Sequence, residues 1–336
     1  MRFTDSEIQS TGAFLQGELE RLDPTIYDPI ADFTWGRDID VREDVTIADE
    51  VTSFIYSTYT GGFGGTGSGS KSWIKGNDTT PARVAVAVNK VLTPLTPWGM
   101  EVSYDIFELQ KAMQAGRPID TQKYDAMKLK HQLDIDVMVY LGDTEVAGGI
   151  KGLLNSDSVA NKELDVFDPK TATPEQIIDY FNTLLDEAWK ATQYTRIPNR
   201  MLVPPVFFAA LASKQLPNTP MNMLEYVKAN NLSVANGGRL EIAPVKWLAD
   251  ASINDGKGRI VAYTKSRDVV RFPLVQLQSM PVQYRGYQQC VPYYGALGGV
   301  EFVRPEMVFY GDLKGEKARS ARVGTAKVGE SKVGKE

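Results

Sequence analysis

The chain has 336 residues, of which 43% are hydrophobic and 24% are charged, and its formal net charge is −5. This composition is typical of a globular protein and excludes collagen, a coiled coil and wholesale disorder. A single cysteine, Cys290, and a single histidine, His131, exclude an intramolecular disulfide scaffold and a four-ligand Cys/His zinc site, whereas a carboxylate site for magnesium or calcium stays open.

Charge is distributed unevenly between the two ends of the chain. Residues 1–50 carry thirteen acidic and four basic side chains, whereas residues 311–336 carry four acidic and seven basic ones. The ends are therefore either solvated tails or an acidic arm that meets a basic tail on a neighbouring copy. An acidic body argues against tight, sequence-independent binding of nucleic acid but is compatible with enclosing it. The sequence has no signal-peptide pattern and no apolar run of membrane-helix length, so we expect a protein made in a reducing cytoplasm.

The first elements in chain order are an arm and a long hairpin. Residues 1–50 are acidic and contain two Asp-Pro breaks, which predict an extended arm with one short helix near residues 7–19. Residues 51–59 and 83–92 have the β-branched or alternating apolar patterns of strands, and residues 61–70 between them are rich in glycine. An isolated two-stranded hairpin is marginal in water, so we expect this one to lie on another surface.

The glycine-rich stretch contains Gly62-Phe63-Gly64-Gly65-Thr66-Gly67, which fits the G-x-G-x-x-G pattern of dinucleotide-binding proteins. That function needs a helix to begin at this point, and residues 68–78 instead have the composition of a turn. A P-loop also fails, because Ser70 stands where the phosphate-binding lysine is needed. The favoured interpretation is a loop at the tip of the hairpin.

Two helices are predicted next, at residues 105–114 and 120–141, with Gly142 ending the second. The apolar stripe expected on the long helix consists of Ala126, Leu129, Leu133, Val137 and Tyr140, and it is widened by Met127, Ile135, Met138 and Leu141. His131, in mid-helix, is interpreted as a packing or surface histidine because no catalytic motif includes it.

Paired acids at Asp38/Asp40 and Asp134/Asp136 are the residues that could suggest acid–base chemistry. Residues two apart on a helix do not face the same way, so a solvated surface is the favoured interpretation of the second pair. The sequence therefore predicts no catalytic, cofactor-binding or metal-binding residue.

The second half of the chain mixes helices and strands. Thr173-Pro174-Glu175-Gln176 is a strong helix start, because a capping Thr is followed by Pro at the first helical position and Gln three residues on. Further helices are expected after Pro204-Pro205 and at Met221–Lys228, and strands at residues 200–203, 239–248, 259–264, 268–272, 281–290 and 300–310. The tail repeats a five-residue unit starting at Ala321, Ala326 and Ser331, which should not fold alone.

Three stretches carry a family resemblance: residues 107–141, then Gly148-Gly149-Ile150-Lys151-Gly152-Leu153-Leu154-Asn155, then Asn199-Arg200-Met201-Leu202-Val203-Pro204-Pro205 before a short helix. In this order they resemble the major capsid proteins of tailed bacteriophages, which share the Hong Kong ninety-seven fold with encapsulins. The resemblance covers about residues 30–311 and leaves out the repeat tail. It implies an α+β fold with an N-terminal arm, an extended β-hairpin loop, a peripheral domain with a long spine helix and an inserted axial α/β domain.

The resemblance also assigns a role to each segment. It implies an arm at residues 1–50, an extended loop at 51–90 lying across an adjacent subunit, a peripheral domain at 91–166 and 273–311, an axial domain at 167–272, and a basic repeat tail at 312–336. Some family members crosslink through a lysine of the extended loop. Lys71 and Lys75 lie there, but no asparagine partner can be matched, so no crosslink is predicted.

The function implied is that of a coat protein and not of an enzyme. Its copies would form pentamers and hexamers of an icosahedral shell around phage double-stranded DNA, assembled in the host bacterial cytoplasm. Scaffold, portal and decoration proteins are the other partners implied, with no membrane and no cofactor. Two alternatives stay open: an encapsulin-like nanocompartment shell, identified by a cargo enzyme, and a soluble nucleotide-binding enzyme, identified by nucleotide affinity and a small, homogeneous species.

Overall fold

The computed structural model describes residues 31–60, 85–115, 119–145, 149–164, 172–216, 220–250, 253–256 and 258–313. The chain divides into two compact units, residues 1–32 and 33–336, and almost all of the first lies outside the described residues. The fold below is therefore that of residues 33–313. The predicted helix at residues 7–19, the glycine-rich tip and the repeat tail also lie outside the described residues.

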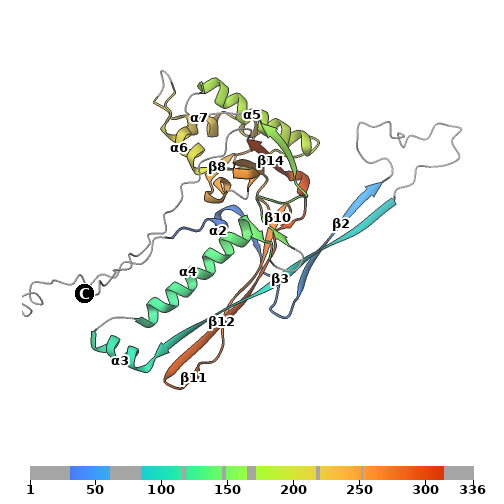
Figure 1. Cartoon of the computed structure of the whole chain (residues 1–336). Coiled ribbons are helices and arrows are strands. Elements are labelled where there is room, and N and C mark those ends of the chain that lie inside the picture. Colours follow the sequence, from blue (N-terminus) through green and yellow to red (C-terminus); the bar gives the residue numbers. More distant parts are fainter. Residues whose placement is uncertain are drawn as a thin grey trace, which may run out of the picture. The chain divides into compact units, whose positions relative to one another are not determined.

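In the described residues, the first sheet has seven strands (Figure 1). These strands are β1 (Asp40–Arg42), β2 (Val51–Thr60), β3 (Ala85–Asp105), β10 (Val270–Ser279), β11 (Gln283–Arg285), β12 (Gln288–Gly298) and β13 (Glu301–Phe302). The path runs β1-β10-β12-β3-β2, while β11 pairs with β12 and β13 with β10. All of these pairs are antiparallel except β1, which runs parallel to β10.

Several predicted strands have different bounds in the structure, including those at 239–248, 268–272 and 300–310. The strand predicted at residues 83–92 is only the first part of β3, which continues to Asp105. The strand predicted at residues 281–290 is two strands joined by a turn at Gly286, whose φ of 61° is the left-handed conformation that glycine tolerates best.

The second sheet has five strands among the described residues, in the order β6-β14-β9-β7-β8. They are β6 (Ala160–Leu164), β14 (Val308–Leu313), β9 (Arg259–Tyr263), β7 (Arg200–Val203) and β8 (Glu241–Pro244). The helices that lie by this sheet in Figure 1 are α5 (Pro174–Ala191), α6 (Pro205–Ser213) and α7 (Met223–Ala229), followed in the chain by the short α8 (Leu232–Ala235). Three 3₁₀ turns complete this part: η1 (Lys246–Ala249), η2 (Asn254–Gly256) and η3 (Pro305–Met307).

The second sheet is buried on both faces. Along β9, Ile260 and Ala262 belong to the hydrophobic cluster of α5, α6 and α7, whereas Val261 and Tyr263 belong to the cluster that contains the long helix α4 (Ile119–Tyr140). Because successive strand residues point to opposite faces, a strand covered on both sides is apolar without interruption. This explains why the predicted strands at 200–203 and 259–264 are such continuous apolar runs in the sequence.

Helix starts follow the predicted signals. The Thr173 side chain accepts a hydrogen bond from the Gln176 backbone while the Gln176 side chain accepts one from the Thr173 backbone, so the capping box that begins α5 is confirmed. Asn222 caps α7 in the same way through the backbone N–H of Glu225. The first predicted helix of the spine region is α3 (Ile106–Ala115).

The apolar face predicted on α4 is only partly right. The helix buries the predicted Met127, Ile135, Met138 and Tyr140 and also His131, Asp136 and Val139, whereas Ala126 and Val137 are exposed. The sequence misled because apolar residues occur on both flanks of this helix, and α4 has neighbours on more than one side, including α2 (Trp35–Asp38) and β3.

The Gly-Leu-Leu-Asn motif closes the C-terminal end of α4. The backbone N–H groups of Leu153 and Leu154 donate to the carbonyls of Val139 and Tyr140, at 2.7 and 3.1 Å. The Asn155 amide donates to the carbonyl of Leu141 at 2.7 Å, and its oxygen accepts from the Gly152 N–H. The loop therefore satisfies the carbonyls that a helix end leaves without partners.

Gly152 packs directly against the backbone at the end of α4, so a substitution at this position tests the packing of the motif. A Cβ atom at this position would lie 2.4 Å from the carbonyl carbon and oxygen of Tyr140. We expect Gly152→Ala to lower the free energy of unfolding by about 1–3 kcal/mol, as overpacking does elsewhere. Gly36→Ala is the control, because nothing lies within 4 Å of the added methyl group. Equal urea denaturation midpoints for the two variants would contradict this account.

Candidate functional site: an assembly surface

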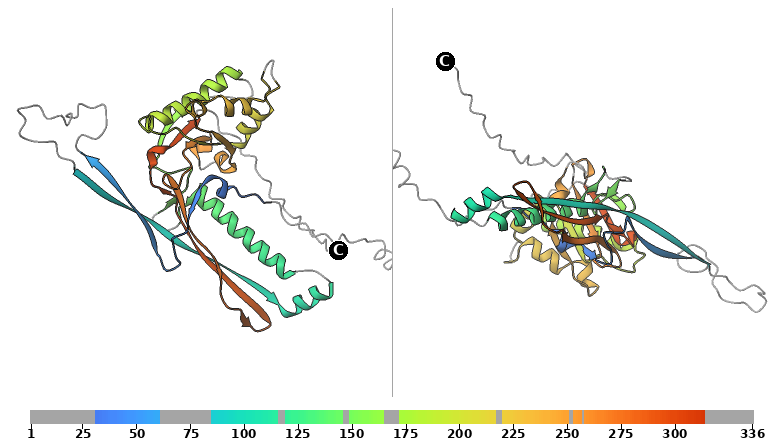
Figure 2. Two further views of the ribbon diagram at one scale, coloured as in Figure 1. Left: turned by 180° about the vertical axis from the view of Figure 1, so that it is seen from behind. Right: turned by 90° about the horizontal axis from the view of Figure 1, so that it is seen from below.

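The hairpin formed by β2 and the first part of β3 extends away from the remaining strands (Figure 2). Its register runs from Val51 opposite Pro94 to Thr60 opposite Ala85. Strand β12 pairs with β3 only from Leu95 onward. Among the described residues, no third strand pairs with the hairpin beyond this point, so both of its edges carry unpaired backbone groups.

One face of the hairpin is aliphatic and exposed. Residues directly opposite each other in an antiparallel pair share a face. The register therefore puts five aliphatic side chains on one face, with exposed fractions between 48% and 67%: Val51, Ile55, Val86, Val88 and Leu92. We call these five residues the aliphatic face. The same face also carries Lys90, opposite Ile55. Exposed apolar side chains that gather on one face are typical of a site of contact with another molecule.

A groove of about 1640 Å³ lies between the hairpin and the body. Its hairpin wall takes residues from both faces of the hairpin, and residues 149–151, 156–158 and 299–306 form the other wall. The hairpin face opposite the aliphatic face is closed at its root, where Phe54 is buried beneath the guanidinium of Arg271, 5.9 Å from the ring centre. The aliphatic face itself is largely exposed in the described part of the chain.

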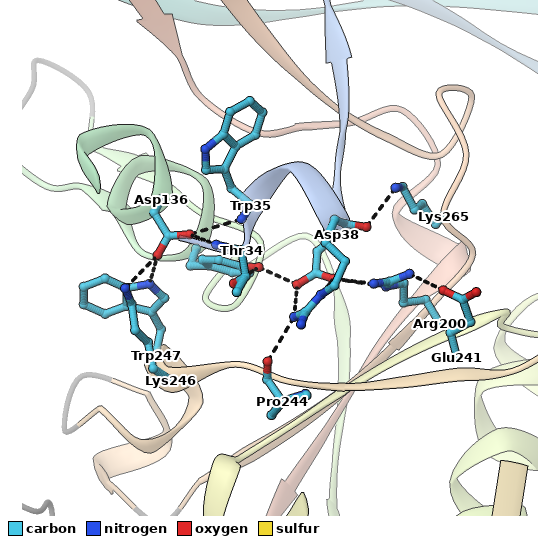
Figure 3. Close-up of polar contacts among 12 residues, drawn as sticks. Thr34, Trp35, Asp38, Asp136, Arg200, Glu241, Pro244, Lys246, Trp247 and Lys265 are labelled. Atoms are coloured by element: carbon cyan, nitrogen blue, oxygen red, sulfur yellow. Dashed lines mark hydrogen bonds and ion pairs between the residues drawn. The ribbon is translucent and has the colours of Figure 1, made fainter. Parts of the chain in front are cut away.

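A second feature is the anchoring of the segment that precedes the hairpin. The Asp38 carboxylate at the end of α2 is fully buried and accepts hydrogen bonds from both Arg37 and Arg200 (Figure 3). The Arg200 Nη2–Oδ1 distance is 2.8 Å, and the Tyr140 hydroxyl donates to the other oxygen. Tyr263 donates to the backbone carbonyl of Asp38 at 2.6 Å.

The two tyrosines have strongly shifted pKa values. Burial raises the pKa of Tyr140, and the adjacent Asp38 carboxylate raises it further. Burial likewise raises the pKa of Tyr263 well above its ordinary value, with Asp38 as the second cause. Both hydroxyls therefore stay protonated and donate to Asp38, while the Tyr140 oxygen also accepts from the Thr34 hydroxyl at 2.9 Å.

Asp136 corrects the interpretation of the paired acids on α4. Its carboxylate is fully buried and accepts from the backbone N–H groups of Thr34 and Trp35, at 2.9 and 3.1 Å, and from the Trp247 indole at 2.7 Å. Asp134, two residues earlier, accepts from the Trp98 indole at 3.0 Å. The two carboxylates differ: Asp136 is buried in protein, whereas Asp134, whose side chain is 27% exposed, also pairs with the exposed Lys130. The solvated interpretation is therefore wrong for Asp136.

The acidic pair Asp38/Asp40 is bound by side chains of other segments. Asp40 is partly exposed and pairs with Lys265 at 3.6 Å, while the oxygens of Asp38 are occupied by arginine and tyrosine donors. Within the described ranges, no group of three His, Cys, Asp or Glu side chains could hold a metal ion. None of the described helices is long and apolar enough to cross a membrane.

Other residues singled out in the sequence are separate from this surface. Cys290 is buried in β12. Lys71, Lys75 and the G-x-G-x-x-G stretch lie outside the described residues. Sequence reasoning missed Arg200, although a charged residue beginning the apolar run Arg200–Val203 is a signal that a buried partner is needed.

Asp38→Asn tests the anchoring. The substitution leaves the Arg200 guanidinium, 7% exposed, without its buried counter-charge. We expect a loss of about 3–5 kcal/mol in the free energy of unfolding, as for other broken buried ion pairs. Asp186→Asn, which removes a half-exposed pair with Lys190, should cost less than about 1 kcal/mol. A similar small loss in both variants, measured by urea denaturation, would contradict the anchoring role.

His131 predicts a dependence of stability on pH. Its side chain is buried against the Trp98 ring, and its Nε2 atom lacks a hydrogen-bond partner. Burial lowers the pKa of His131, with Asp134 opposing, so the unfolded chain takes up this proton at a higher pH than the folded chain. The stabilisation is therefore complete above the unfolded pKa of 6.5 and is lost as the pH falls toward the folded value.

The check is to compare the wild type with His131→Asn between about pH 7.5 and about pH 5.5. We expect the free energy of unfolding of the wild type to fall more steeply, by at most about 1.4 kcal/mol per pH unit for one proton. Parallel pH curves for the two proteins would show that His131 does not titrate in this way.

Several known proteins are similar to this chain in sequence pattern or in fold. A family model for the major capsid protein matches residues 69–313. The solved capsid of Myoviridae phage XM1 is 18% identical with a TM-score of 0.71, covering 89% of this chain and 98% of that one. The capsid of a native GTA particle is 8% identical with a TM-score of 0.60, covering 90% and 98%. A chain of Mycobacterium phage Bobi is 10% identical with a TM-score of 0.58, covering 94% and 100%.

No curated protein sequence matches this chain. The structural likenesses, all below one fifth identity, confirm the predicted α+β fold of phage capsid proteins. The family model spans well over half of the sequence. The chain therefore belongs to the major capsid protein family.

Proposed function

We propose that copies of this coat protein assemble as pentamers and hexamers of an icosahedral shell that encloses phage double-stranded DNA. The observation that carries the proposal is the aliphatic face, which a single described chain leaves exposed. In this proposal a second copy covers it. The residues 51–90, proposed as the extended loop, correspond to β2 and the first part of β3, and they would lie across the adjacent subunit.

The energy of one such contact is modest, and assembly would rest on many of them. Covering the exposed half of an aliphatic side chain contributes about 1 kcal/mol, so five of them give about 5 kcal/mol per hairpin before the cost of ordering. A contact between a hairpin of one copy and a different surface of the next is heterologous, and such contacts close into rings when the rotation permits. Many weak contacts of this kind are multiplied over a whole shell.

The remaining segments receive roles in the same proposal. The peripheral domain would comprise residues 91–166 and 273–311, and the axial domain residues 167–272, with an arm at 1–50 and a basic tail at 312–336. Scaffold, portal and decoration proteins are the proposed further partners, and the proposed site of assembly is the host bacterial cytoplasm. The family match favours this structural role over a soluble nucleotide-binding enzyme.

Val88→Lys tests the proposal. The variant subunit should fold with a free energy of unfolding within about 0.5 kcal/mol of the wild type, because the position is exposed. Its particle yield should drop by about tenfold or more, because burying an unpaired charge costs more than the ~1.4 kcal/mol that equals a factor of ten. Sedimentation velocity and negative-stain electron microscopy measure this yield.

Asn89→Lys is the matched control. Asn89 is exposed on the same hairpin, and its pairing with Tyr56 places it on the opposite face. This variant adds the same charge one residue away and should assemble nearly as well as the wild type. Equal particle yields for Val88→Lys and Asn89→Lys would overturn the role of the aliphatic face.

A further inference from the structure

Strand β3 changes partner at one point along its length. It pairs with β2 up to Pro94 and with β12 from Leu95 onward. Proline has no backbone N–H to donate, so the joint falls where the ladder is already weakened. A single strand crosses this joint, and a two-stranded hairpin that continues from one strand can swing unless something holds its root.

Arg42 holds the root of the hairpin from the neighbouring strand β1. Its Nη1 atom donates to the backbone carbonyl of Ser53 in β2 at 3.3 Å. The same nitrogen lies 3.0 and 3.2 Å from the two carboxylate oxygens of Glu301 in β13. Its Nε and Nη2 atoms bind Asp44 at 2.6 and 3.1 Å. One guanidinium thus joins the hairpin to two segments of the body.

Glu301 is the buried centre of this group. Its side chain is fully buried, and its Oε2 atom accepts a hydrogen bond from the Nε atom of a second arginine, Arg271 of β10, at 2.7 Å. Arg271 also covers the ring of Phe54 on the hairpin. The carboxylate therefore orients both arginines, and both arginines contact the root of the hairpin.

Close packing supports the same joint from the other strand. A Cβ atom on Gly299 would lie 2.9 Å from a methyl carbon of Thr93, directly before the joint, and 2.6 Å from a methyl carbon of Ile150. The backbone N–H of Leu95 donates to the carbonyl of Glu50 at 3.0 Å. The hairpin root is thus seated in one position on residues of the body.

We propose that Glu301, through Arg42 and Arg271, is a positioning residue that sets the direction in which the hairpin leaves the body. A buried carboxylate shared by two arginines has few alternative arrangements, because any swing of the hairpin root would separate charges that are out of water. Glu301 and the two arginines therefore hold the hairpin in one orientation, where without them it could leave the body in several. The importance of this positioning for shell assembly rests on the proposed function, whereas the positioning itself does not.

The test measures the hairpin direction in isolated subunits. Spin labels at Asn89→Cys on the hairpin and Ser158→Cys on the body, in a Cys290→Ser background, report one distance between hairpin and body by pulsed electron paramagnetic resonance. Asn89 and Ser158 are both exposed, and Cys290 is the single native cysteine. The wild-type distribution should be narrow. Glu301→Gln should broaden it by about twofold, as expected when a joint loses the contacts that define one arrangement.

The matched control is Asp312→Asn. It removes a similarly buried ion pair with Arg259, 12% and 9% exposed, in the second sheet. We expect it to lower the thermal unfolding temperature and to leave the distance distribution narrow. Arg42→Lys is the second test variant, because lysine has no planar fork to span three partners. It keeps Glu301 paired with Arg271 and so protects the fold.

Broadening in Glu301→Gln and Arg42→Lys but not in Asp312→Asn supports the proposal. A narrow distribution in Glu301→Gln, or equal broadening in Asp312→Asn, overturns it. If Glu301→Gln does not fold, Arg42→Lys decides, and a narrow distribution there overturns the proposal. Because the labels report on unassembled subunits, a failure of shell formation would be recognised separately and would not change this result.

Discussion

The fold depends on one constraint: the hairpin of β2 and β3 has an apolar face that its own described chain does not cover. A two-stranded ribbon with open edges is marginal in water, and five exposed aliphatic side chains add to its cost. Such a surface is tolerable in a protein whose working form contains many copies. The features described above either present this surface in one direction or make the remainder of the subunit stable enough to carry it.

The body supplies that stability through a sheet buried on both faces and through carboxylates with several partners each. Asp38, Asp136 and Glu301 are fully buried, and each binds groups from segments far away in the sequence. Buried ion pairs add little net stability compared with apolar packing, but breaking one is costly. Their effect here is to fix how the residues 34–42 lie against α4 and the two sheets. The body is held in one arrangement, and the hairpin takes its direction from it.

Local signals in the sequence were sufficient to predict several individual elements of this fold. The capping box at Thr173, the apolar strand at 200–203 and the hairpin itself follow from short-range patterns, because caps, strand alternation and turn residues act within a few positions. The exposure of Ala126 and Val137 on α4 and the environment of Asp136 did not follow. Both depend on which segments pack around the helix, and a helix with neighbours on more than one side has no single apolar stripe. The domain boundaries stay a prediction.

The most direct measurement is hydrogen exchange of the hairpin backbone, comparing residues 54–60 and 85–92 in isolated subunits and in assembled particles. The account predicts fast exchange in subunits at the unpaired edges and strong protection in particles, while β9 and β14 in the body are protected in both. Equal exchange of the hairpin in the two states, slow or fast, would contradict the claim that a second copy completes it.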